Sequence, residues 1–125
     1  MTSAALALAA GLFDVGFAAF HLAFWRLFGW PRRLAPLDPV NRSLMPVMNI
    51  ALTALFTVIG LALALAPEDA ATGRTGRWLL LGMTGFWLLR AIVQPAYFGL
   101  AHPASAALAI LFLLGSALHL AALLA

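Results

Sequence analysis

Residues 44–66, LMPVMNIALTALFTVIGLALALA, decide the fold because they form a long apolar run without one charged side chain. About 20 mostly apolar residues are needed to cross the roughly 30 Å of hydrocarbon in a bilayer. Three further stretches reach that length, at residues 4–25, 78–98 and 104–124. Alanine and leucine dominate them, and none alternates like a barrel strand. Because only helices or closed barrels satisfy their backbone groups in lipid, the sequence predicts an all-α, membrane-spanning four-helix bundle.

The composition agrees with a lipid environment. The chain has 125 residues, of which 65% are hydrophobic and only 9% charged, whereas a soluble domain carries about 25% charged residues. The length predicts a single transmembrane domain over residues 1–125. Without cysteine, disulfides and thiolate metal sites are excluded. The net charge of +3 comes from arginines between apolar runs, which indicates topology and not nucleic-acid binding.

The arginines between the spans predict the orientation. The first loop holds Arg26, Arg32, Arg33 and Arg42, whereas the second loop holds only Arg74 and Arg77. Loops one and three share a side, so that side is predicted to be cytoplasmic, with both termini outside the cytoplasm. The N-terminus has no basic segment before its apolar run, so we expect it to stay as a helix. In the first loop, Asn41 and Ser43 are candidate caps for the second helix.

Two charged side chains fall inside the spans, Asp14 in the first and Arg90 in the third. Each costs roughly 2.5–3.5 kcal/mol on insertion scales, so each needs a partner or a purpose. Their depths differ by about 6 Å at the helical rise per residue, which an arginine side chain can span. An Asp14–Arg90 pair is therefore feasible. The alternative partner for Asp14 is His119, whose depth differs from that of Asp14 by only about 4 Å.

Further polar side chains form stripes on three helices. His21, Asn49 and Gln94 share a depth of roughly 6–9 Å from the cytoplasmic ends and predict one layer. Arg90, Gln94 and Tyr97 follow the i, i+4, i+7 pattern of one helical face. The stripes are predicted to face inward as a ligand-binding or structural cluster, with the members Asp14, His21, Asn49, Thr53, Arg90, Gln94 and Tyr97.

Cofactor chemistry finds little support in the residue spacing. His21 and His119 differ by about 15 Å in depth, which is a poor arrangement for a bis-histidine haem. Asp14, His21 and His119 match no metal-ligand motif. No nucleophile elbow or phosphate-binding glycine loop is present. We therefore predict no cofactor, no metal site and no assignable catalytic residue, and the sequence favours a protein that is not an enzyme.

Three segments resemble a known family. They are FHLAFWRLFGWP at residues 20–31, VNRSLM at 40–45 leading to Asn49, and FWLLRAIVQ at 86–94. Together they resemble an uncharacterised family of small bacterial four-helix integral membrane proteins, which implies a multi-pass protein of the bacterial inner membrane. The resemblance carries no chemistry. It implies that the recognisable pattern includes His21, Asn41, Arg42, Asn49, Arg90 and Gln94.

Three classes of function stay open from the sequence. The polar cluster can organise the bundle of a structural or interaction protein. It can bind a small polar or anionic ligand in a transporter or binding protein, with Arg90 as the anchor. It can also belong to a membrane enzyme that uses His21 as an acid or base. The lipid bilayer is the expected partner in each case, and a second copy or another membrane protein stays open.

Overall fold

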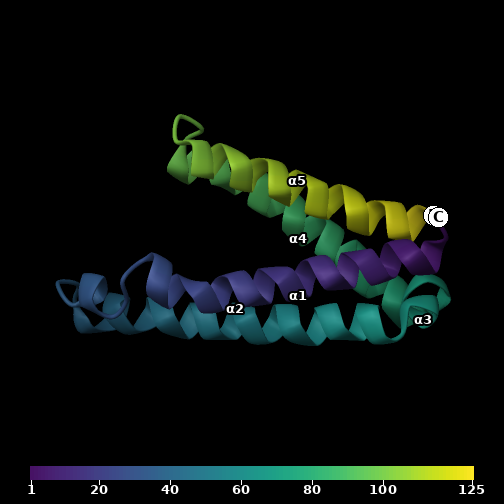
Figure 1. Cartoon of the computed structure of the whole chain (residues 1–125), viewed down its shortest axis with the longest axis horizontal. Coiled ribbons are helices and arrows are strands. Elements are labelled where there is room, and N and C mark those ends of the chain that lie inside the picture. Colours follow the sequence, from purple (N-terminus) through teal and green to yellow (C-terminus); the bar gives the residue numbers. More distant parts are fainter.

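The computed structural model describes all residues from Met1 to Ala125 and is all-helical (Figure 1). Four helices are long and apolar enough to cross a membrane: α1 (Ser3–Leu27), α2 (Pro39–Leu65), α4 (Arg74–Phe98) and α5 (Pro103–Leu124). A short 3₁₀ helix, η1 (Arg32–Leu34), lies between α1 and α2, and the short α3 (Pro67–Thr72) lies between α2 and α4. The predicted fold class is confirmed.

Local capping explains where the helices begin. Asp38 accepts hydrogen bonds from the backbone N–H groups of Val40 and Asn41, and Pro39 occupies the first turn of α2. The side-chain amide of Asn41 also donates to Asp38 and holds the pKa of that carboxyl group below its usual range. The predicted cap at Asn41 or Ser43 was therefore wrong, because Asp38 starts the helix several residues earlier.

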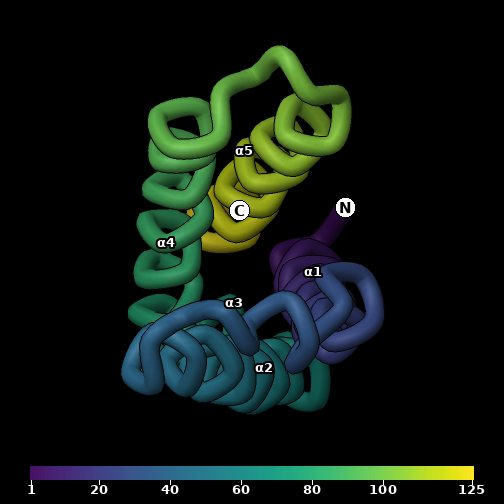
Figure 2. The backbone as a smooth tube through the Cα atoms, turned by 90° about the vertical axis from the view of Figure 1, so that its left-hand side faces the viewer, coloured from purple at the N-terminus to yellow at the C-terminus, as the bar shows by residue number.

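The helices form two hairpins, and Figure 1 shows how the hairpins are joined. α1 packs along α2, α4 packs along α5, and α1 also contacts α5. The hairpins meet at the end that carries α3 and both termini, and they diverge toward the other end. Figure 2 looks into this open end, where the α4–α5 hairpin stands apart from α1 and α2. The cavities described below lie between the hairpins.

The α1–α2 contact depends on small residues. A Cβ atom added at Gly11 would lie 2.5 Å from the carbonyl oxygen of Gly60 and 2.6 Å from the backbone nitrogen of Ala64. The two backbones therefore touch directly, in the manner of small-residue contacts between membrane helices. This contact fixes α1 against α2 and leaves the rest of α1 to face the other hairpin.

Candidate functional site

Asp14 lies at the centre of a buried polar cluster where the two hairpins meet. Its side chain is fully enclosed, with an exposed fraction of 0%. The indole Nε1–H of Trp87 on α4 donates to Asp14 Oδ1 over 3.0 Å. The ring Nε2 of His119 on α5 lies 3.1 Å from Asp14 Oδ2. One carboxyl group therefore connects α1 to both helices of the second hairpin.

The partners of His119 determine the charge of this cluster. Its Nδ1 lies 2.8 Å from the carbonyl oxygen of Gly115, which can only accept, so Nδ1 must carry a proton. One further proton must lie between Nε2 and the carboxyl oxygen of Asp14. The pair is then either imidazolium with carboxylate or imidazole with carboxylic acid. In both arrangements the net charge is zero, which suits a buried site between membrane helices.

Of the two partners that the sequence left open for Asp14, the structure pairs it with His119 and not with Arg90. His119–Asp14 is the only ion pair in the molecule. The reason is that α1 packs directly on α5, which brings His119 to Asp14. On α4 the position that faces Asp14 is occupied by Trp87, one helical turn before Arg90.

Arg90 has no anionic partner in the protein. Its guanidinium carbon lies 4.7 Å from the centroid of the Phe112 ring, an orientation that allows a cation–π interaction. No carboxylate lies within salt-bridge distance, and no protein group accepts a hydrogen bond from it. The half-buried side chain borders a cavity of about 300 Å³ between the hairpins. The cavity walls are mostly aromatic: Phe17, Phe20, Phe24, Phe56, Phe86, Trp87 and Phe112.

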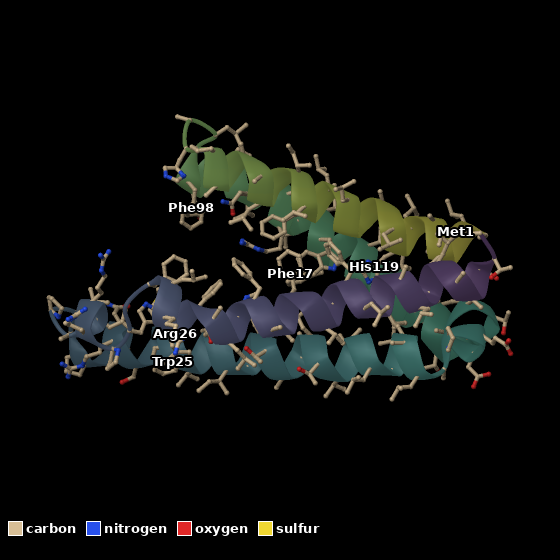
Figure 3. The ribbon with its side chains drawn as sticks, viewed as in Figure 1. Met1, Phe17, Trp25, Arg26, Phe98 and His119 are labelled. Carbon is tan, nitrogen blue, oxygen red and sulfur yellow. The ribbon has the colours of Figure 1, made fainter.

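A second, outer cavity of about 460 Å³ lies next to the first and extends toward the open end. His21, Phe24 and Leu52 border both cavities. Residues from the first loop and from the end of α4 also line the outer cavity. Figure 3 shows Phe98 at the end of α4, across from the end of α1 that carries Trp25 and Arg26. Its remaining lining residues are Phe28, Trp30, Arg33, Met45, Met48, Asn49 and Phe98.

The chain path after α1 brings the first loop over this outer cavity. Gly29 has a positive φ of 64°, a conformation that glycine adopts without strain. The backbone N–H of Trp30 then donates back to the carbonyl of Trp25, which ends the helix. This turn places Trp30 and Arg33 on the cavity wall.

The ring of His21 lies on the wall of both cavities and has one free acceptor. Its Nδ1 lies 2.8 Å from the carbonyl oxygen of Phe17 one turn earlier, so Nδ1 carries the proton. Nε2 of the neutral ring is then a free acceptor. The ring stacks on Phe24 with centroids 4.7 Å apart, which fixes its orientation. His21 can therefore accept a hydrogen bond from a molecule in either cavity.

The predicted layer of His21, Asn49 and Gln94 forms only in part. Asn49 Nδ2 donates to the backbone carbonyl of His21 over 3.1 Å, so these two residues meet. Gln94 instead donates to the hydroxyl of Ser105, which itself donates to the carbonyl of Gly99. Gln94 thus packs against α5 and closes the α4–α5 turn, and no hydrogen bond joins it to His21 or Asn49.

The other members of the predicted cluster lie elsewhere. Tyr97 was predicted to face inward, yet 81% of its side chain is exposed. It belongs to the last turn of α4, where the hairpins have diverged and no neighbouring helix covers that face. Thr53 donates to the backbone carbonyl of Asn49 within its own helix, so its hydroxyl is already satisfied.

Sequence reasoning missed three participants. Trp87 was not among the predicted site residues, although an indole N–H inside a span requires an acceptor and thereby points to Asp14. Nothing in the sequence distinguishes Phe112 as a contact of Arg90, because a phenylalanine in an apolar helix most often serves only for packing. Arg33 was interpreted only as a topology signal, and its place on the cavity wall depends on the turn at Gly29.

No three histidine or acidic side chains lie close enough together to hold a metal ion. The polar groups of the two cavities are thus two arginines, a histidine and an asparagine within aromatic and aliphatic walls. Such a lining suits a molecule with one polar end and an apolar body. No family model matches the chain, and no curated protein or solved structure is significantly similar to it.

Proposed function

We propose that this multi-pass membrane protein binds a small amphipathic anion in the cavity between its two hairpins. The observation that carries the proposal is that Arg90 has no anionic partner. Arginine stays protonated in proteins and has five donors, so within the bilayer it requires acceptors. Asp14, the only acid within the spans, is already bound to His119 and Trp87. A carboxylate or phosphate group of a ligand would supply the missing acceptors.

The surroundings of Arg90 support an apolar body attached to that anionic group. The inner cavity has aromatic walls, and the Phe112 ring holds the guanidinium by one face. The planar edge of the guanidinium can then form two parallel hydrogen bonds to a carboxylate or phosphate. Two adjoining cavities of about 300 and 460 Å³ are in the size range of small-molecule sites.

Binding of decanoate would test this function. We expect radiolabelled decanoate to be retained by the protein in phosphatidylcholine nanodiscs above the level of empty nanodiscs. The Arg90→Gln variant should bind about ten-fold more weakly or worse, because a hydrogen bond to a charged group is lost. The Arg90→Lys variant should bind decanoate with intermediate affinity, because lysine keeps the positive charge but lacks the paired N–H donors of the guanidinium.

Two controls make the decanoate result specific. Arg74→Gln removes an arginine near the opposite end of the bundle and should leave decanoate binding unchanged. Decanol has a similar chain without the anion, so its retention should not depend on Arg90. Equal binding of decanoate to the parent protein and to Arg90→Gln would refute the proposal.

We further infer that the open end faces the cytoplasm of a bacterial inner membrane. The open end, from Arg26 near the end of α1 to Arg42 in the first turn of α2, carries four arginines, against two, Arg74 and Arg77, at the start of α4. Reporter fusions at Met1 and Ala125 should therefore both signal from outside the cytoplasm. Cytoplasmic signals from both ends would overturn the orientation, and signals from opposite sides would overturn the number of spans. A ligand would then enter from the cytoplasmic side or its leaflet.

A further inference from the structure

One polar atom of a residue that lines the outer cavity is buried without a hydrogen-bond partner. Asn49 is 4% exposed, and its Oδ1 forms no hydrogen bond. The orientation of the amide follows from its other end, because Nδ2 must face the carbonyl oxygen of His21. Oδ1 is therefore the free end. Since almost all buried polar atoms in folded proteins are paired, this oxygen indicates a donor from outside the chain.

His21 adds a second acceptor to the same cavity. The Nδ1–H group of its ring is already bound to the carbonyl of Phe17, which leaves Nε2 unprotonated in the neutral ring. Asn49 lines the outer cavity, Arg90 lines the inner one, and His21 lines both. An anion alone would satisfy Arg90 and would leave the acceptors without donors.

We propose that the outer cavity binds a hydroxyl or amino group of the ligand, with Asn49 Oδ1 as its acceptor. This inference rests on the proposed function and specifies its ligand class: an amphipathic anion with a second polar group that donates a hydrogen bond. Aliphatic hydroxy acids are the simplest members of this class. The anionic group contacts Arg90, the hydroxyl group contacts Asn49, and the chain lies along Phe24 and Leu52, which border both cavities.

Competition among matched ligands would test the inference on the unaltered protein. Radiolabelled decanoate in nanodiscs is displaced with unlabelled decanoate, 3-hydroxydecanoate, 10-hydroxydecanoate or 3-methoxydecanoate. We expect one of the hydroxy acids to bind about three- to ten-fold more tightly than decanoate, as a single added hydrogen bond would produce. The methoxy acid keeps the ether oxygen but has no O–H donor, so it should not bind more tightly than decanoate. The favoured hydroxyl position would report the separation between the two polar contacts.

Two variants assign the effect to Asn49. Asn49→Leu should abolish the preference for the hydroxy acid and should keep the affinity for decanoate. Thr53→Val is the matched control, because the Thr53 hydroxyl contacts only the backbone of Asn49, and it should keep the preference. If Asn49→Leu fails to fold, the comparison of hydroxy and methoxy acids on the parent protein still decides whether the outer cavity accepts a hydrogen-bond donor.

The outcomes separate this inference from the proposed function. If no ligand binds through Arg90, both are overturned. If decanoate binds through Arg90 and neither hydroxy acid binds more tightly, only the donor site is overturned, and an ordered water satisfies Asn49. A hydroxyl preference that persists in Asn49→Leu also overturns the donor site, since another group would then accept the hydrogen bond.

Discussion

Replacing Asp14 with alanine is expected to lower the free energy of unfolding by about 3–5 kcal/mol, because it removes one partner of a buried pair. The indole N–H of Trp87 and Nε2 of His119 would both lose their partner. Asp14→Asn should lose only about 1 kcal/mol. The asparagine oxygen can accept from Trp87, and its amide can donate to a neutral His119. This contrast follows from the zero net charge of the pair.

Unfolding in mixed detergent micelles, followed by tryptophan fluorescence, would measure these variants. Double-mutant cycles then identify the true partner of Asp14. We expect the Asp14→Ala/His119→Ala double mutant to lose clearly less free energy of unfolding than the sum of the losses in the two single mutants. The losses in free energy of unfolding caused by Asp14→Ala and by Arg90→Leu should be additive to within about 0.5 kcal/mol. Strong coupling of Asp14 with Arg90 would contradict the buried network described here.

Replacing Gly11 with leucine should be similarly damaging, at about 3 kcal/mol or more, the upper end of the cost of overpacking. The first added carbon would already meet the backbone of Gly60 and Ala64, at 2.5 and 2.6 Å. Backbone atoms cannot turn aside as a side chain can, so α1 and α2 would have to separate. The cavities would change shape with them, because α1 and α2 both line them.

Gly16 supplies the matched control for the Gly11 substitution. It lies in the same helix, and a Cβ atom added there would meet nothing within 4 Å. Gly16→Ala should therefore stabilise the protein by about 0.5–1 kcal/mol through the better helix propensity of alanine. Mixed-micelle unfolding should show opposite signs at the two positions. Equal effects would mean that Gly11 acts through helix propensity and not through close packing.

The sequence predicted the helices well, because the need to satisfy backbone groups in lipid leaves few alternatives. It did not predict which helices are neighbours. Depth along a helix placed Asp14 within reach of both Arg90 and His119, and only the contact between α1 and α5 decides between them. The small residues Gly60 and Ala64, four positions apart, mark the contact between α1 and α2, but such a spacing is hard to recognise in a chain so rich in alanine.

The candidate site was predicted in part for a related reason. Depth along the helices placed Asn49 near His21, and helical periodicity turned Arg90 toward the other helices, where it borders a cavity. The same periodicity failed for Tyr97, because a shared helical face is buried only where another helix covers it. The divergence of the hairpins depends on their packing at the opposite end, and no local pattern encodes it.

The bond between Asp14 and His119 also has a consequence for biosynthesis. The two residues are separated by 105 positions, and Trp87 follows Asp14 by 73. At about 5–20 residues per second, the ribosome needs roughly 5–20 s to produce His119 after Asp14. Over the first 73 residues of that interval the carboxyl group of the first helix has neither partner, and until its end the carboxyl group lacks His119. The buried carboxyl group of the first helix to be translated is therefore fully paired only when the last helix has been made. A chain that stops short of α5 leaves Asp14 without His119.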